Sequence, residues 1–130
     1  MAIYDENDAY DAVYDRENVF AKILRGEIPC DKVYEDEHVL AFNDIDPKMP
    51  VHILVIPKGS YISIEDFGAN ASAQEVKAFF EAVSKIVKEK GIAESGFRSI
   101  ANAGKDGGQE VPHFHLHILG GAPVGALVGD

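Results

Sequence analysis

Three histidines alternate with three large apolar residues in the stretch His113-Phe114-His115-Leu116-His117-Ile118-Leu119-Gly120-Gly121. Successive side chains of a β-strand point to opposite faces of the sheet, so this strict alternation predicts a strand. The three histidines would share one face, and the apolar residues between them would pack on the other. The chain holds five histidines in all, so a face with three of them is the first place to look for function.

The pattern around this stretch predicts an α+β fold. A short helix is predicted over 18–25, where Asn18 can cap the first turn and Gly26 can end the last. Ser72 and Glu75 form a capping-box pair before the main helix, whose apolar residues recur at helical spacing. That apolar set is Val76, Phe79, Phe80, Val83, Ile86 and Val87.

Four further strands are predicted, over 30–34, 38–43, 51–56 and 97–101, with a short helical turn near 64–67. Most connections between strands are too short for parallel crossovers, because a parallel crossover needs a dozen or more residues. The sequence therefore predicts an antiparallel five-stranded sheet with a short N-terminal helix and one long central helix.

Composition limits the possible functions. The 130 residues suffice for one domain with a core of its own. The net charge is −10, which disfavours binding to a nucleic-acid backbone, since that binding is driven by Lys and Arg. Neither a signal peptide nor a membrane-length apolar run is visible, and the single cysteine, Cys30, cannot form an intrachain disulfide. We therefore expect a cytoplasmic protein without a membrane partner, in which Cys30 is structural.

The two ends differ from the predicted domain, 18–121. Residues 1–17 form an acidic arm with six acidic residues and one arginine, and residues 122–130 form a short C-terminal tail. Tyr10, Val13 and Tyr14 have helical spacing, which would let part of the arm dock as a helical turn. The charge density of the arm favours a loosely packed tail instead.

Three interpretations of the histidine face are open from the residues alone. It could bind a metal such as Zn²⁺, although three alternate strand positions spread over roughly 13 Å and cannot easily surround one ion. It could catalyse a reaction at phosphorus, because a neutral imidazole is a good nucleophile and its neighbours can stabilise developing charge. His115, in the middle, would then be the nucleophile. The histidines could also be purely structural.

Residues elsewhere in the chain favour a phosphate ligand. Gly107, Gly108 and Gln109 precede the histidine stretch, and the backbone amides of a Gly-rich turn can form a nest that binds an anion. His52 interrupts an apolar strand on the face shared by Leu54 and Ile56. It could be a core residue, or a fourth imidazole that reaches the same site.

Several separated motifs resemble the histidine-triad family, and its Hint branch in particular. The resemblance runs over about 18–121, and its triad motif is three histidines separated by apolar residues. The matching segments are Asp106-Gly107-Gly108-Gln109 through Gly121, Ile28-Pro29, Leu40-Ala41-Phe42-Asn43-Asp44-Ile45, and His52 with Val55-Ile56-Pro57-Lys58. The resemblance implies a homodimer whose sheets join, with a purine-nucleotide site and no cofactor or metal ion.

The resemblance also implies a role for each site residue. His115 would attack the α-phosphorus and form a nucleotidyl-histidine intermediate, His117 would contact the phosphate, and His113 and His52 would orient the nucleophile. Asp44 would accept hydrogen bonds from the ribose, and Asn102 would contact the phosphate and leaving group. The predicted nucleotide-binding set is completed by an apolar wall and the Gly-rich loop: Phe20, Ile23, Phe42, Asn43, Ile45, Gly108, Gln109 and Glu110.

Three positions depart from the family pattern. Glu110 stands where well-known eukaryotic relatives have Ser, which indicates a bacterial member, and we expect its backbone amide rather than its carboxylate to face the ligand. Pro112 removes one N–H, so strand pairing is predicted to begin at His113. The tail has no aromatic residue, so the preference for a leaving group cannot be transferred from the family.

The leading functional hypothesis is a nucleoside 5′-phosphoramidase that releases a purine nucleoside monophosphate. Two alternatives remain: a non-catalytic nucleotide-binding adaptor and a dinucleoside polyphosphate hydrolase.

Overall fold

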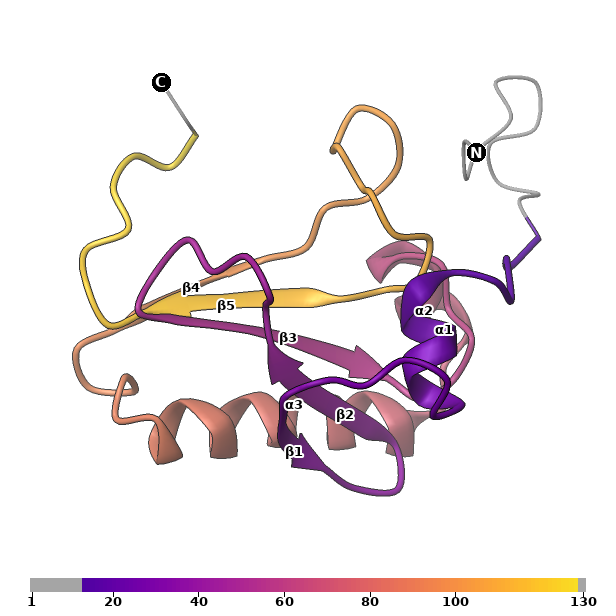
Figure 1. The fold of residues 1–130 in the computed structure, drawn as a ribbon, viewed down its shortest axis with the longest axis horizontal. Coiled ribbons are helices and arrows are strands. Elements are labelled where there is room, and N and C mark those ends of the chain that lie inside the picture. Colours follow the sequence, from indigo (N-terminus) through magenta and orange to yellow (C-terminus); the bar gives the residue numbers. More distant parts are fainter. Residues whose placement is uncertain (1–12, 129–130) are drawn as a thin grey trace.

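An antiparallel sheet of five strands organises the computed structural model, which describes residues 13–128 (Figure 1). The strands lie in the order β1-β2-β3-β5-β4. The α+β architecture is confirmed, with the predicted turn near 64–67 extended to a third helix. The elements are α1 (Val19–Leu24), β1 (Lys32–Glu35), β2 (Val39–Asn43), β3 (Val51–Pro57), α2 (Ile64–Asn70), α3 (Ala73–Glu89), β4 (Phe97–Ile100) and β5 (Leu116–Gly120).

Local capping explains where α1 and α3 begin. The Asn18 side chain accepts a hydrogen bond from the backbone N–H of Ala21, at 2.8 Å. Ser72 and Glu75 form both bonds of a capping box at the start of α3, which satisfies N–H groups that have no partner within the helix. Phe80 differs from the prediction, since it is 56% exposed while Ala82 is fully buried. Phe80 lies at the margin of the apolar stripe, whereas Ala82 lies between Phe79 and Ile86.

Different helices pack on the two faces of the sheet (Figure 1). The long helix α3 packs against the face that carries Ile53, Val55 and Ile118. Phe20 of α1 packs against the opposite face. Because side chains alternate along a strand, the histidines of the 113–117 stretch lie on the α1 side. Phe114, Leu116 and Ile118 lie in the core under α3, as predicted.

The histidine strand begins later than predicted. Pairing between β3 and β5 starts at Val55 and Leu116, not at His113. Continuing that register would bring Phe114 opposite Pro57, which has no N–H to donate. Phe114 instead donates its N–H to the carbonyl of Tyr61 at 2.7 Å, and His113 donates to Val111 at 2.8 Å. Two of the three triad histidines therefore lie on a loop that leads into the strand.

Both ends of the described chain contact the domain. Val13 to Asn18 form no helix, yet Tyr14 is half-buried and its hydroxyl lies 2.5 Å from Nδ1 of His113. The expectation of a loosely packed arm is therefore wrong at Tyr14, which packs against the domain. The alternative of a docked helical turn is not found over Val13 and Tyr14, and Tyr10 lies outside the described residues. The domain boundaries at 18 and 121 remain predictions. No helix within 13–128 has the length and apolar character needed to cross a membrane.

Candidate active site

A cavity of about 460 Å³ lies on the α1 side of the sheet. It is bordered by α1, the end of β2, the Gly-rich loop and the histidine stretch. Eleven of the residues that the sequence predicts for the site line it: Phe20, Ile23, Phe42, Asn43, Asp44, Ile45, Asn102, Gly108, Glu110, His115 and His117.

Three predicted residues do not line this cavity. His113 is fully buried and His52 is nearly so, and neither of them borders the cavity. Gln109 turns inward, where its amide nitrogen donates to the carbonyls of Ile62 and Val111, at 2.6 and 2.9 Å. The lining also includes residues that the sequence did not predict for the site. They are Cys30 and the apolar residues Val19, Ile28, Pro29, Leu54 and Val111.

Hydrogen bonds define which nitrogen of His115 is free. Its Nδ1 lies 2.7 Å from the backbone carbonyl oxygen of His113. A carbonyl can only accept, so Nδ1 must carry the proton and Nε2 must carry the lone pair. Burial lowers the pKa of His115 below its usual value, which keeps the ring neutral at neutral pH. The ring thus presents an unprotonated nitrogen to the cavity.

The hydrogen bonds of His113, the residue whose carbonyl contacts His115, also define its tautomer. Its Nε2 donates to the carbonyl oxygen of Pro57 at 2.8 Å, so its Nδ1 is the acceptor that faces the Tyr14 hydroxyl. Burial, together with the nearby His115, lowers the pKa of His113 to about 4. A neutral His113 is what this pair of hydrogen bonds requires. Sequence reasoning did not find the Tyr14 contact, because nothing local links an arm residue to the triad.

His117 is set in the opposite tautomer. The backbone N–H of Lys48 donates to Nδ1 of His52 at 3.0 Å, so His52 carries its proton on Nε2. That nitrogen lies 3.0 Å from Nδ1 of His117, which must therefore accept, leaving the proton of His117 on Nε2. Burial lowers the pKa of His117 to about 4. His117 thus offers an N–H to the cavity, beside the lone pair of His115.

Asp44 lies at the rim of the cavity, on the loop after β2. One carboxylate oxygen accepts the backbone N–H of Asp46 at 2.8 Å, and the other lies 3.3 Å from Nε2 of His52. Each carboxylate oxygen has two lone pairs, so Asp44 can still accept hydrogen bonds from a ligand. Ile45 beside it is fully exposed and forms part of the apolar mouth.

The Gly-rich loop differs from the anion nest that the sequence indicated. The N–H of Gly108 donates to the backbone carbonyl of Lys105, and that of Gln109 donates to the backbone carbonyl of Gly104, both at 3.1 Å. These two amides therefore already have partners within the turn. Gly107 is needed for close approach, because a Cβ there would lie 2.4 Å from the carbonyl oxygen of Ala103. The loop is therefore a compact turn that lines the cavity with Gly108 and Glu110.

Three side chains of the site lie close enough together to hold a metal ion, but their ligand atoms already form hydrogen bonds with one another or with the backbone. Ligand atoms of Asp44, His52 and His117 lie within 4.8 Å of one another, a set that differs from the alternate triad positions considered from the sequence. The facing nitrogens of His52 and His117 share one proton. A metal would require two lone pairs there, and the Lys48 N–H leaves His52 none on Nε2. The donor set therefore fits imidazole orientation better than ion binding.

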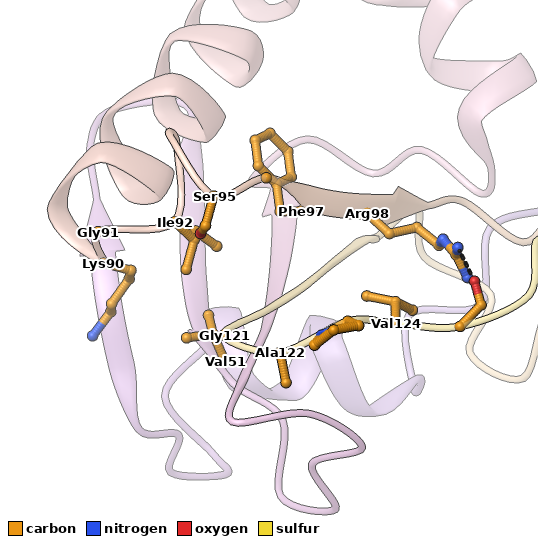
Figure 2. Close-up of a pocket in the computed structure, with 13 residues that line it drawn as sticks. Val51, Lys90, Gly91, Ile92, Ser95, Phe97, Arg98, Gly121, Ala122 and Val124 are labelled. Atoms are coloured by element: carbon orange, nitrogen blue, oxygen red, sulfur yellow. Dashed lines mark hydrogen bonds between the residues drawn. The ribbon is translucent and has the colours of Figure 1, made fainter.

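A larger cavity of about 850 Å³ lies at the start of β4, next to the C-terminal tail (Figure 2). Arg98 lines it and donates to the tail carbonyls of Gly125 and Ala126, at 2.9 and 2.8 Å. Its lining contains Lys90 and Ser95 but neither a histidine nor a carboxylate. Because the cavity lacks the paired imidazoles that the histidine cavity offers, it is the weaker candidate for a catalytic site.

Comparisons with known proteins agree with the site. The family model of the HIT domain matches residues 25–124. An uncharacterized HIT-like protein of Azospirillum brasilense is 52% identical over 88% of this chain and 94% of its own. The purine nucleoside phosphoramidase of Escherichia coli is 45% identical over 86% of this chain and 93% of its own. A HIT family hydrolase from Clostridium thermocellum has a TM-score of 0.79 and 40% identity, covering 88% and 98% of the two chains.

These relatives are bacterial, as the Glu110 position indicated. The family match covers more than half of the chain and includes the whole histidine stretch. By its sequence, its sheet and its row of imidazoles, the chain belongs to the HIT domain family, and it is similar to hydrolases of that family.

Proposed function

We propose that this protein is a purine nucleoside 5′-phosphoramidase that works through a covalent nucleotidyl-histidine on His115. One observation carries the proposal: His115 and His117 face one cavity in opposite tautomers, with a lone pair on the first and an N–H on the second. That is the arrangement which a two-step displacement at phosphorus requires. The similarity to the Escherichia coli phosphoramidase supports the choice of substrate.

In the first step, Nε2 of His115 attacks the α-phosphorus and the P–N bond breaks. The leaving nitrogen keeps the electron pair of that bond and takes a proton from water. In the second step, water attacks the phosphorus and gives up a proton to the hydroxide left from the first step, the bond to His115 breaks, and the ring recovers its lone pair. The products are a nucleoside monophosphate and an amine. The N–H of His117 would stabilise the charge that develops on the phosphoryl oxygens in both steps.

The remainder of the cavity fits a nucleoside. Its floor and walls are largely apolar, with Phe20 and Phe42 among them, which suits a purine base. Asp44, with lone pairs to spare, would accept the ribose hydroxyls. Asn102 also lines the cavity, and Glu110 is exposed. We propose Asn102 as a phosphate contact, and the backbone of Glu110 rather than its carboxylate as the ligand-facing group.

We also propose that the protein acts as a homodimer in which two sheets join along β4. Within the described residues β4 is an edge strand, and an edge strand presents unpaired backbone groups to a second copy. Phe97 on this strand is 39% exposed. Sedimentation equilibrium would test this: a dimer mass is expected, and a monomer at micromolar concentration would refute the dimer. The cytoplasmic location and the absence of a nucleic-acid partner remain predictions.

The activity is tested by comparing substrates. Purified protein should release AMP from an adenosine 5′-phosphoramidate much faster than it cleaves a diadenosine polyphosphate. Rapid acid quench followed by mass spectrometry should detect a peptide with His115 that carries a nucleoside monophosphate. Faster cleavage of the polyphosphate would favour the dinucleoside polyphosphate hydrolase instead. Nucleotide binding without cleavage of either substrate would favour the adaptor.

A further inference from the structure

Tyr14 contacts the histidine triad from outside the recognised domain. It belongs to the acidic arm and precedes the range 25–124 that matches the family model. Its hydroxyl lies 2.5 Å from Nδ1 of His113, and the two rings meet edge to face with their centroids 5.6 Å apart. The hydroxyl must donate, because Nε2 of His113 already carries the ring proton that is given to Pro57.

Two hydrogen bonds fix the orientation of the His113 ring. His113 precedes β5, so the sheet does not hold its backbone. Its imidazole is held instead by Pro57 on one side and Tyr14 on the other. The ring is fully buried, so solvent is not in place to replace a missing donor at Nδ1, and a buried acceptor without a partner is costly.

The backbone carbonyl of the same residue sets the tautomer of the nucleophile. It accepts the Nδ1 proton of His115 at 2.7 Å, and this bond is what leaves the lone pair on Nε2. A displacement of the His113 backbone therefore reaches His115 directly. Phe20 packs against His113 and His115 with centroid distances of 6.3 and 5.0 Å, but a phenyl ring cannot supply a hydrogen bond.

We propose that Tyr14 is a positioning residue for His115: its hydroxyl holds the His113 ring so that the His113 carbonyl keeps the nucleophile in its reactive tautomer. The kinetic part of this inference rests on the proposed phosphoramidase activity. Tyr14 would act through His113 without touching the substrate, and it gives the N-terminal arm a function that the HIT domain model does not cover. Burial raises the pKa of Tyr14, so the phenol keeps the proton that it donates.

The test compares Tyr14→Phe with Tyr34→Phe. The first variant removes only the hydroxyl and keeps the ring that packs against His113. The second removes a hydroxyl that donates to Asp36 at 2.8 Å on the other side of the molecule. Each full-length protein is labelled with ¹⁵N-histidine. We then measure the ring-nitrogen resonances, the melting temperature, and kcat and KM on adenosine 5′-phosphoramidate.

In Tyr14→Phe we expect the resonances of His113 Nδ1 and His115 Nδ1 to move and kcat to fall about fivefold to tenfold, with KM within about twofold. Tyr34→Phe should leave the resonances and kcat unchanged. Unmoved ring resonances in Tyr14→Phe would overturn the proposal, as would an equal loss of kcat in both variants. If the wild-type protein cleaves no phosphoramidate, the proposed function fails. The resonances then still decide whether Tyr14 positions His115.

Discussion

The two imidazole pairs of the cavity make an instructive comparison. One pair is His115 with His113, and the other is His117 with His52. The two pairs lie side by side, and the ring centroids of His115 and His117 are 5.3 Å apart. The first pair presents a lone pair and the second presents an N–H, although all four residues are the same amino acid. The difference arises at the nitrogen that faces away from the cavity. His115 donates there to a carbonyl, whereas His117 accepts there from a ring. The partner of the far nitrogen therefore decides what an imidazole can do chemically.

Removing the lone pair of the first pair should have the largest effect. In His115→Ala we expect turnover of adenosine 5′-phosphoramidate to fall by roughly 10⁴-fold or more, because no nucleophile remains. Binding of AMP should survive, as measured by calorimetry, since the apolar wall and Asp44 are intact. The matched control is His38→Ala, which removes the histidine that belongs to neither imidazole pair. Turnover near the wild-type rate in His115→Ala would contradict the assignment.

The second pair can be dissected by a double-mutant cycle. In His52→Ala we expect kcat to fall roughly tenfold to a hundredfold, because His117 loses the donor that fixes its tautomer. His117→Ala should lose at least as much. The double variant should lose no more than His117→Ala alone, since His52 acts only through His117. Additive losses would show that His52 has a separate role.

Substitution of Asp44 tests whether its carboxylate binds the ribose. In Asp44→Asn we expect KM for the ribonucleotide substrate to rise about tenfold, because a charged acceptor becomes a neutral one. A 2′,3′-dideoxy substrate separates two causes, since Asp44 also lies near His52. If the ribose contact is responsible, the substitution should barely change KM for the dideoxy substrate. An equal loss on both substrates would assign Asp44 to the orientation of His52.

Burial of both pairs should appear in the pH dependence of stability. The pKa of His113 is lowered to about 4, whereas an unfolded chain gives histidine a pKa of ~6.5. Between these values the unfolded state binds more protons, so stability is complete above pH ~6.5 and is lost as the pH falls through the folded pKa. We expect the melting temperature to fall by several degrees between about pH 7 and pH 5. His117 shifts in the same direction.

His113→Asn should be less stable at neutral pH but should flatten this acid slope, because the position can no longer take up a proton. Calorimetry at a series of pH values measures both effects. An unchanged slope in His113→Asn would mean that other groups account for the acid sensitivity.

Local patterns predicted most of the fold because their physical causes are local. Asn18, Ser72 and Glu75 cap helices through bonds that span three residues. The alternation through Phe114 and Leu116 separates the two sheet faces. The start of β5 was missed because it depends on Pro57, which register alone brings opposite Phe114. Phe80 was misplaced because the width of the buried stripe depends on what covers the helix.

The histidine row was evident from residue type and spacing, and the separated motifs carried the resemblance to the family. Asp44 and the apolar wall followed from that resemblance. The tautomers of the row were not evident, because they depend on Lys48, Pro57 and the His113 carbonyl, which only folding brings to the rings. The inward turn of Gln109 and the contact of Tyr14 were invisible for the same reason. The type of side chain determines which reactions a residue can take part in. Which ring nitrogen of a histidine carries the proton is determined by neighbours that are distant in the chain.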